Sequence, residues 1–215
     1  LKLKDAICDR FRKFHKDKRP DVNPEKPDIL FNLHINKNKV TISMDSSGTS
    51  LHQRGNRMEQ TIAPINEVLA AGLILMSKWD RQSHFVDAMC GSGTIVVEAA
   101  SLAINKAPNL DRNYFCFKHW KNYDKTLYND ICTELDMKIT DFDFKIIGSD
   151  NNKKAVFIAQ NNVKKAGFSN IVEIRETSIQ KMIPPMGKGT LIINPPYGER
   201  METYQIDLLY KQIGT

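Results

Sequence analysis

The stretch HFVDAMCGSGTIVVEAASLAI, residues 84–104, decides the fold of this chain. Its first four residues predict a short buried strand, and TIVVEAASLAI (94–104) predicts a helix that is apolar nearly all round. Between them, Gly91 and Gly93 allow backbone conformations and close approaches that a Cβ atom would block. A strand that turns through glycines directly into a helix offers the free N–H groups of the helix to a negatively charged ligand group. The alternative is a plain tight connection without a ligand.

Downstream of this stretch, strands and helices alternate. We expect, in chain order, a strand at 144–150, a helix at 153–167 ending on Gly167, a strand at 170–176 and a strand at 190–194. Strands that are continuous apolar runs between helices indicate a parallel sheet covered on both faces. The fold class is therefore α/β, a doubly wound and mostly parallel sheet, whose ligands bind beyond the carboxyl ends of the strands. Pro64 suits the first residue of a further helix before the first strand.

The chain before this sheet has a different pattern. Residues 3–14 place apolar side chains at helical spacing, and ILFNLHI and KVTISMD flank the turn NKN as a β-hairpin does. About 50 residues are few for an independent domain. We therefore expect this α+β segment to be the end of a domain whose beginning lies outside the sequence, followed by a polar linker.

Composition narrows the class of protein. The chain has 215 residues, a formal net charge of +6 and 41% hydrophobic residues, so it can bury a core, and its charge suits an anionic partner such as nucleic acid. A basic protein without such a partner is the alternative. The scattered cysteines predict neither a disulfide framework nor a metal site, and reduced thiols are typical of a cytoplasmic protein. No apolar run approaches the roughly 20 residues of a membrane span.

Acidic residues end two of the expected strands. Asp87 closes the first, and Asp150 closes the second, where a carboxylate can accept both hydroxyls of a ribose or simply cap the next helix. A nicotinamide dinucleotide fits poorly, because the turn is GSG rather than G-x-G-x-x-G. The acidic residue also follows Gly93 by 57 positions, against about 20 in the dinucleotide fingerprint.

The last expected strand runs into Asn194-Pro195-Pro196-Tyr197. Prolines cannot donate to a sheet, so the strand must stop there and the backbone is fixed. The Asn194 amide oxygen and the Pro195 carbonyl can then converge on one point, and two acceptors suit an –NH2 group. Tyr197 can offer its ring face to a planar ligand. This corner predicts a site for an aromatic amine such as the exocyclic amino group of a nucleobase.

At this point the sequence resembles a known family. DAMCGSGT with INPPY resembles the class I methyltransferases that use S-adenosyl-L-methionine (AdoMet) to methylate amino groups. DAMCGSGTIVVEAA, LHQRG and APINEVLAAGLI narrow the resemblance to the THUMP-linked RNA guanine-N2 methyltransferases, and within these to the bacterial large-subunit rRNA enzymes designated L. It covers most of the chain. It implies a partial THUMP-like RNA-binding domain at 1–47, a linker at 48–60 and, at 61–215, the first four strands of a Rossmann-like methyltransferase sheet that is incomplete at its C-terminal end.

The resemblance also implies roles for single residues. Asp87 and the loop after it would hold the methionine end of AdoMet, and Asp150 would accept the ribose hydroxyls. Ser178 stands near the place of a family Asp that binds the adenine amino group. The implied catalytic residues are Asn194, Pro195, Pro196 and Tyr197, and the implied cofactor-binding residues are Asp87, Cys90, Gly91, Ser92, Gly93, Thr94, Asp150, Asn151, Ser178 and Asn194. Cys90 as a nucleophile is disfavoured because it lies in the cofactor loop, and no metal is implied.

The implied substrate is a guanine in RNA, with 23S rRNA or a pre-ribosomal particle as the partner. His52, Arg54 and Arg57 of the linker would contact RNA phosphates or the base pocket, unless they are simply solvated. Residues 105–140 contain the aromatic and lysine-rich run NYFCFKHWKNYDKTLY, which is either an RNA platform or, as we favour, an extra element packed on the sheet. Other readings of the chain are an adenine-N6 or protein-glutamine methyltransferase, and an RNA-binding module without activity.

Overall fold

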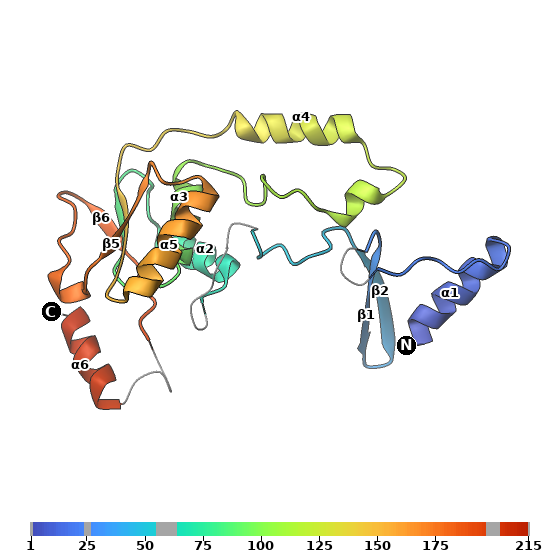
Figure 1. Cartoon of the computed structure of the whole chain (residues 1–215), viewed down its shortest axis with the longest axis horizontal. Helices are drawn as coiled ribbons and strands as arrows, with labels where there is room; N and C mark the ends of the chain where they lie inside the picture. The colour runs from blue at the N-terminus through green and yellow to red at the C-terminus, as the bar shows by residue number, and fades with distance from the viewer. Residues whose placement is uncertain (1, 24–26, 55–63, 197–202, 215) are drawn as a thin grey trace. The chain divides into compact units, whose positions relative to one another are not determined.

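The computed structural model describes residues 2–23, 27–54, 64–196 and 203–214. The chain forms two compact units, each drawn from two stretches of sequence (Figure 1). We call them the N-terminal unit, Leu1–Thr49 with Asn113–Asp124, and the sheet unit, Ser50–Arg112 with Lys125–Thr215. Among the described helices, none is long and apolar enough to cross a membrane.

The N-terminal unit contains one helix and one hairpin from its first stretch. Helix α1 spans Lys2–Phe14, and strands β1 (Leu30–Asn36) and β2 (Lys39–Asp45) pair antiparallel. The two residues between the strands both have positive φ, at 46° and 60°, as a type I′ turn requires. The predicted helix and hairpin are confirmed.

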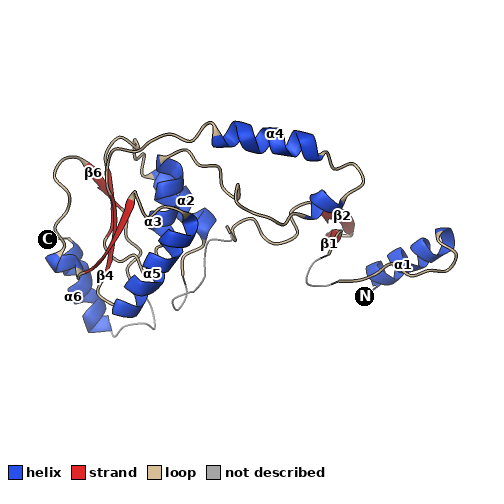
Figure 2. Cartoon of the chain, turned by 45° about the horizontal axis from the view of Figure 1, so that its top comes forward, coloured by secondary structure: helices blue, strands red, loops and turns tan. Residues whose placement is uncertain are grey.

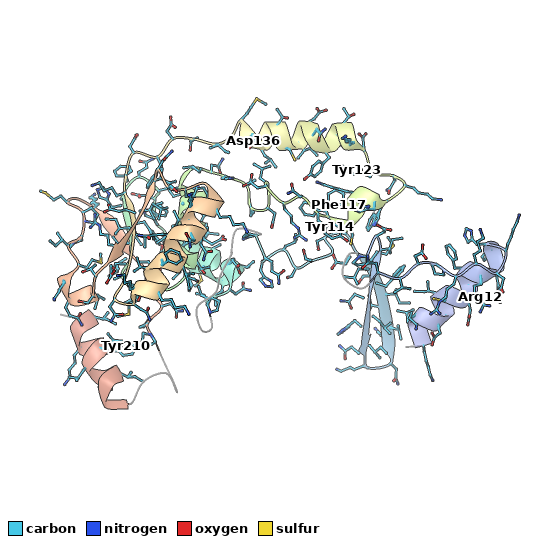
Figure 3. All side chains as sticks on the ribbon, in the orientation of Figure 1. Arg12, Tyr114, Phe117, Tyr123, Asp136 and Tyr210 are labelled. Carbon is cyan, nitrogen blue, oxygen red and sulfur yellow. The ribbon has the colours of Figure 1, made fainter. Side chains whose placement is uncertain are left out.

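The second stretch of this unit is the aromatic segment, residues 113–124, which contains the 3-10 helix η1 (Cys116–His119). The backbone N–H of Phe117 donates to the Ser46 carbonyl (3.0 Å), and the Tyr114 hydroxyl donates to the Pro27 carbonyl (Figure 3). The indole N–H of Trp120 donates to the Asp28 carbonyl at 3.1 Å. Our expectation that this aromatic run packs on the parallel sheet is therefore wrong for residues 113–124, because these partners all belong to the N-terminal unit.

The sheet unit is built on four parallel strands in the order β5-β4-β3-β6. Figure 2 labels β4 and β6 of this sheet. The strands are β3 (His84–Asp87), β4 (Ile146–Asp150), β5 (Val172–Glu176) and β6 (Gly189–Leu191). The helices are α2 (Glu67–Met76), α3 (Thr94–Ala103), α4 (Lys125–Asp136), α5 (Lys153–Ala166) and α6 (Thr203–Ile213), with the 3-10 helix η2 at Ile179–Lys181. The predicted α/β parallel sheet is confirmed.

The core of the sheet unit explains why β3 and α3 form where the sequence places them. Phe85, Ile146 and Val96 are fully buried, and they belong to two neighbouring strands and the helix that packs on them. Because a helix that is apolar nearly all round must be covered on several sides, α3 also packs against α2 and α5. The glycine loop between β3 and α3 is thereby fixed at the centre of the unit.

Several element ends differ from the prediction: β4 and β5 each begin two residues later than expected, at Ile146 and Val172. Helix α2 begins at Glu67 rather than at Pro64, because the Asn66 side chain caps it by accepting the Val68 and Leu69 N–H groups. Strand β6 ends at Leu191 rather than Asn194. The Ile192 N–H still donates to the Val86 carbonyl (3.0 Å). Because β3 ends at Asp87, one residue after Val86, the residues after Ile192 have no strand to pair with on that side.

Candidate active site

The carboxyl ends of the parallel strands meet at one edge of the sheet, and backbone hydrogen bonds tie the loops there together. The Cys90 N–H donates to the Ser149 carbonyl (2.8 Å), which joins the glycine loop to the end of β4. The Thr177 N–H donates to the Asp150 carbonyl (3.0 Å), which joins the loop after β5 to the same place. With β6 held beside β3, the segments that carry the predicted site residues start from one edge.

Asp87, the last residue of β3, is fully buried. One carboxylate oxygen, Oδ1, accepts the Met89 N–H (3.1 Å), whereas Oδ2 has no hydrogen-bond partner among the described residues. Burial raises the pKa of Asp87 to about 7; the Met89 N–H lowers it and the Asp150 charge raises it. A buried acceptor without a donor is rare in proteins and suits a ligand group that carries N–H protons.

The glycine loop after Asp87 leads directly into α3. Gly91 and Gly93 have φ of 53° and 82°, in the left-handed region that favours glycine. A Cβ on Gly93 would lie 3.2 Å from the Cβ of Ala159, so the loop also needs glycine for its close packing against α5. Gly93 is the N-cap of α3 and provides no side-chain cap. The first N–H groups of α3 therefore remain suited to a ligand.

Asp150, the last residue of β4, bridges two loops. Its Oδ2 accepts the Gly91 N–H (2.9 Å) and its Oδ1 accepts the Asn152 N–H (2.9 Å). Each carboxylate oxygen has a further lone pair, so Asp150 can still accept ribose hydroxyls. Asn151 is exposed beside it, and Ser178 follows β5 as a half-buried residue whose hydroxyl makes no cap to η2.

The Asn-Pro-Pro corner lies three residues beyond the end of β6. Asn194, Pro195 and Pro196 are half-buried, whereas Tyr197 lies outside the described residues.

Burial raises the pKa of the Cys90 thiol well above its ordinary value, and the charges of Asp87 and Asp150 raise it further. Because a nucleophilic cysteine needs its thiolate form, this supports our expectation that Cys90 only lines the loop.

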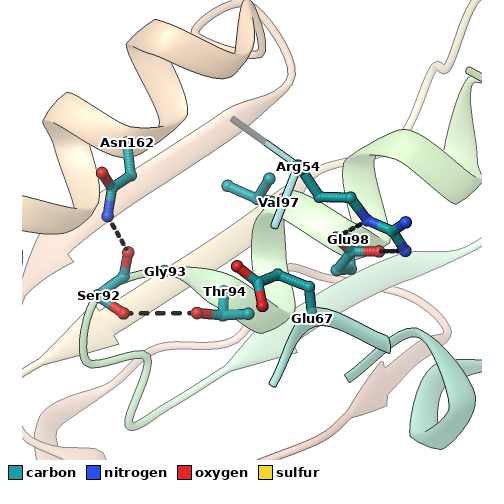
Figure 4. Close-up of a pocket in the computed structure, with 8 residues that line it drawn as sticks. All are labelled: Arg54, Glu67, Ser92, Gly93, Thr94, Val97, Glu98 and Asn162. Carbon is teal, nitrogen blue, oxygen red and sulfur yellow. Dashed lines mark hydrogen bonds and ion pairs between the residues drawn. The ribbon is translucent and has the colours of Figure 1, made fainter. Parts of the chain in front are cut away.

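The linker residues that we expected to touch RNA differ in their surroundings. Arg54 forms an ion pair with Glu98 of α3 and is largely buried (Figure 4). His52 is half-buried, and its Nδ1 is 2.7 Å from the Ser50 hydroxyl. Arg57 lies outside the described residues. Arg54 is thus committed to a partner within the sheet unit.

Two buried polar residues that line a cavity with the glycine loop were missed in the sequence. The Asn162 amide N–H on α5 donates to the Ser92 carbonyl (2.9 Å), and both residues are buried. Glu98 is buried one turn after Thr94. Each is a polar residue on a helix face that is otherwise apolar, which is the signal that could have identified them.

The sheet unit matches the model of the family described as "RMKL-like, methyltransferase domain" over residues 54–215. The chain belongs to the RMKL-like methyltransferase family. The THUMP domain model matches residues 1–45, so the partial α+β segment that we predicted is a THUMP-domain segment at the N-terminus of a methyltransferase fold.

Relatives of this RMKL-like chain are longer proteins. It is 41% identical over 221 residues to the ribosomal RNA large subunit methyltransferase K/L of Psychromonas ingrahamii, and 39% identical over 220 residues to that of Shewanella sp. strain W3-18-1. Each match covers the whole chain but only 29% and 31% of those proteins. The chain therefore spans about three-tenths of the length of these relatives.

Solved structures share the fold. One is SMU.472, described as a putative methyltransferase complexed with SAH, with a TM-score of 0.84 and 34% identity over 97% of this chain and 55% of that one. Another is a predicted N6-adenine-specific DNA methylase from Listeria monocytogenes, with a TM-score of 0.85 and 31% identity over 99% of this chain and 56% of that one. The RMKL-like chain thus has the parallel-sheet methyltransferase fold.

Proposed function

We propose that this chain carries the cofactor-binding and amino-group-binding parts of an AdoMet-dependent methyltransferase that acts on guanine N2 in RNA, with 23S rRNA as its substrate. The observation that carries the proposal is the convergence at one sheet edge of Asp87, the glycine loop, Asp150 and the strand that leads into Asn194. The THUMP-domain segment supports an RNA partner, and the names of the K/L relatives support large-subunit rRNA.

The residues at this edge fit AdoMet by their donors and acceptors. The unpartnered Oδ2 of Asp87 suits the ammonium group of the methionine end, and the uncapped N–H groups of α3 suit its carboxylate. Asp150 would accept the ribose hydroxyls, with Asn151 and Ser178 near the adenine. Bound AdoMet supplies an electrophilic methyl group, so the protein mainly positions the acceptor and excludes water.

The Asn-Pro-Pro corner would hold the acceptor base. A guanine must leave its stack to reach this corner, at a cost of a few kcal/mol. Accepting both N–H bonds of N2 at the Asn194 amide and the Pro195 carbonyl localises the nitrogen lone pair, which in the free base is delocalised into the ring. Pro196 fixes the backbone and Tyr197 would stack on the base. The nitrogen would take the methyl group from the sulfur of AdoMet, which leaves as S-adenosylhomocysteine, and would lose one proton to solvent.

Adenine N6 is the second candidate acceptor. It is also an –NH2 group on a conjugated ring, so the same corner suits it, and the Listeria neighbour is named as a predicted N6-adenine-specific DNA methylase. The THUMP-domain segment favours RNA over DNA. The two candidates differ in the modified nucleoside that they leave in the substrate.

The first test is the substitution Asn194→Ala in the full-length protein. We expect methyl transfer to 23S rRNA to fall at least about 100-fold, because the amino group loses an acceptor, whereas the Kd for S-adenosylhomocysteine stays within about threefold. Transfer is measured by mass spectrometry of digested nucleosides. Asn170→Ala is the matched control, because Asn170 is exposed and precedes the amino end of β5.

The outcomes of this test separate the candidates. N2-methylguanosine made by the wild type but not by the Asn194 variant supports the proposal. N6-methyladenosine would move the acceptor to adenine. Near-normal turnover in the variant would remove Asn194 from the mechanism, and cofactor binding without any transfer by the wild type would favour an inactive RNA-binding module.

A further inference from the structure

Arg54 and Glu98 form a buried ion pair beside the glycine loop. The Arg54 Nε lies 3.2 Å from Glu98 Oε1, and Nη2 donates to Oε2 at 3.4 Å. The two side chains are only 14% and 7% exposed. A carboxylate removed from water needs a charged or hydrogen-bonding partner, and Glu98 receives one from a residue 44 positions away in the sequence.

The same guanidinium also holds the backbone of the linker. Its Nη1 donates to the Leu51 carbonyl (3.1 Å), and that carbonyl also accepts the Asn109 amide N–H (3.1 Å). The turn that contains Leu51 is closed by the Gln53 N–H, which donates to the Ser50 carbonyl (3.1 Å). Arg54 is the first residue of the methyltransferase family match. Arg54 therefore connects the linker backbone to α3 at the residue where the family match begins.

A small cavity lies between this ion pair and the glycine loop (Figure 4). Arg54 and Glu98 line it from one side, and the backbone of the loop lines it from the other. The buried Glu67 and Asn162 also line the cavity. The ion pair therefore lies next to the loop and to the first turn of α3, which has no side-chain N-cap.

We infer that Arg54 is a positioning residue for the cofactor loop. By neutralising Glu98 and fastening Leu51, it holds the first turns of α3, and with them the 90–94 loop, in the conformation that binds the cofactor. The inference rests on the proposed function and deepens it. It also changes the role expected for Arg54, because a guanidinium held by a carboxylate and a carbonyl inside the sheet unit does not serve as an RNA phosphate contact.

The test measures binding of S-adenosylhomocysteine by calorimetry to the full-length protein and its variants. We expect Arg54→Met to raise the Kd at least about tenfold, because it removes the guanidinium that pairs with the buried Glu98 carboxylate. Arg54→Lys keeps the charge and should restore the Kd to within about threefold. Arg175→Met is the matched control, because Arg175 pairs with Glu173 in the same unit at a more exposed position (32% and 53%).

Further measurements keep the inference testable if Arg54→Met folds poorly. Circular dichroism follows folding, and the double variant Arg54→Met/Glu98→Met, which removes both charges of this pair, should bind more tightly than Arg54→Met alone. A lower melting temperature with unchanged Kd in Arg54→Met would overturn the inference and leave a purely structural pair. Unchanged Kd with weaker binding to an rRNA fragment would overturn it in favour of an RNA contact. If the wild type does not bind S-adenosylhomocysteine, that result contradicts the proposed function itself and not only the inference on Arg54.

Discussion

Asp87 has one carboxylate oxygen in a hydrogen bond and, among the described atoms, one without a donor. Burial raises its pKa to about 7, so the unliganded protein keeps a proton there to a much higher pH than an exposed aspartate does. A cationic ligand group at Oδ2 would stabilise the ionised form and release that proton. Binding of such a ligand should therefore strengthen as the pH rises from 6 to 8.

The raised pKa also makes a prediction about stability. The folded pKa of Asp87 lies above the ordinary value of about 3.9 for an unfolded chain. The folded state therefore holds the proton more tightly, and its stability falls by a few kcal/mol as the pH rises from about 4 to about 7. In Asp87→Asn this part of the pH dependence should disappear, as measured by urea unfolding at pH 5 and pH 8.

A matched control lies in the same unit. Asp80 is exposed, and the Gln82 N–H and the Ser83 hydroxyl lower its pKa, so its contribution has the opposite sign. Asp80→Asn should leave the loss of stability towards pH 8 in place. An Asp87→Asn protein whose stability changes with pH as in the wild type would show that Asp87 does not titrate in this range.

At the scale of elements, α5 supports the glycine loop through one buried amide. The Asn162 N–H reaches the Ser92 carbonyl at 2.9 Å, and Ala159 of the same helix lies close to Gly93. Helix α5 is itself held at both ends, by the Asn152 side chain and by Gly167 in a left-handed C-cap. A rigid helix therefore fixes a loop whose own sequence is flexible.

We expect Asn162→Ala to lower the free energy of unfolding by about 1–3 kcal/mol, because it leaves the buried Ser92 carbonyl without this donor. The loss should appear as a lower urea midpoint, with faster amide hydrogen exchange in the 90–94 loop than in the wild type. The neighbouring Asn161→Ala, at a half-exposed position, is the control. Equal exchange in both variants would show that α5 does not hold the loop.

The elements show which features could be predicted from sequence and which could not. Strand β3 has its predicted bounds because the apolar pair Phe85 and Val86 stands shortly before the glycine turn and Asp87 ends the strand. The start of α2 was misplaced because the Asn66 side chain caps two N–H groups, which decides the helix start more strongly than Pro64 does. Local patterns fix an element well when the deciding interactions lie within it.

The residues of the candidate site also include some that could be predicted from the sequence and some that could not. Asp87 and Asp150 could be found because parallel strands place their carboxyl ends at one edge. The hydrogen bonds of Glu98 with Arg54 and of Asn162 with Ser92 join residues 44 and 70 positions apart. The spacing of apolar residues does not identify such a pair. A polar residue on an apolar helix face indicates only that it has some hydrogen-bond partner when buried.

At the scale of the whole molecule, the N-terminal unit is completed by a segment from far along the sequence. The aromatic segment supplies the Phe117, Tyr114 and Trp120 hydrogen bonds to the first stretch of this unit. A Cβ on Gly48 would lie 2.8 Å from the Cys116 sulfur, which shows how closely the two stretches pack. The hairpin and α1 are therefore not expected to be fully stable without it.

Replacing residues 113–124 with a Gly/Ser linker of equal length should destabilise the N-terminal unit alone. Hydrogen exchange should become faster in β1 and β2, because their unit loses these hydrogen bonds and a buried cysteine, while β3 to β5 keep their protection. The milder Tyr114→Phe variant should give a smaller change of the same kind. Equal loss of protection in both units would show that they unfold together.

The discontinuous N-terminal unit has a consequence for the order of synthesis. A ribosome that has made Thr49 must add roughly 75 more residues before Asp124 exists. At about 5–20 residues per second, this takes about 4–15 s. Throughout that time the hairpin lacks its contacts with residues 113–124, and apolar side chains such as Phe31 and Ile42 are exposed in this structure even with those contacts made. During this period the apolar side chains of the hairpin are most exposed, and we expect chaperones to bind the nascent chain then.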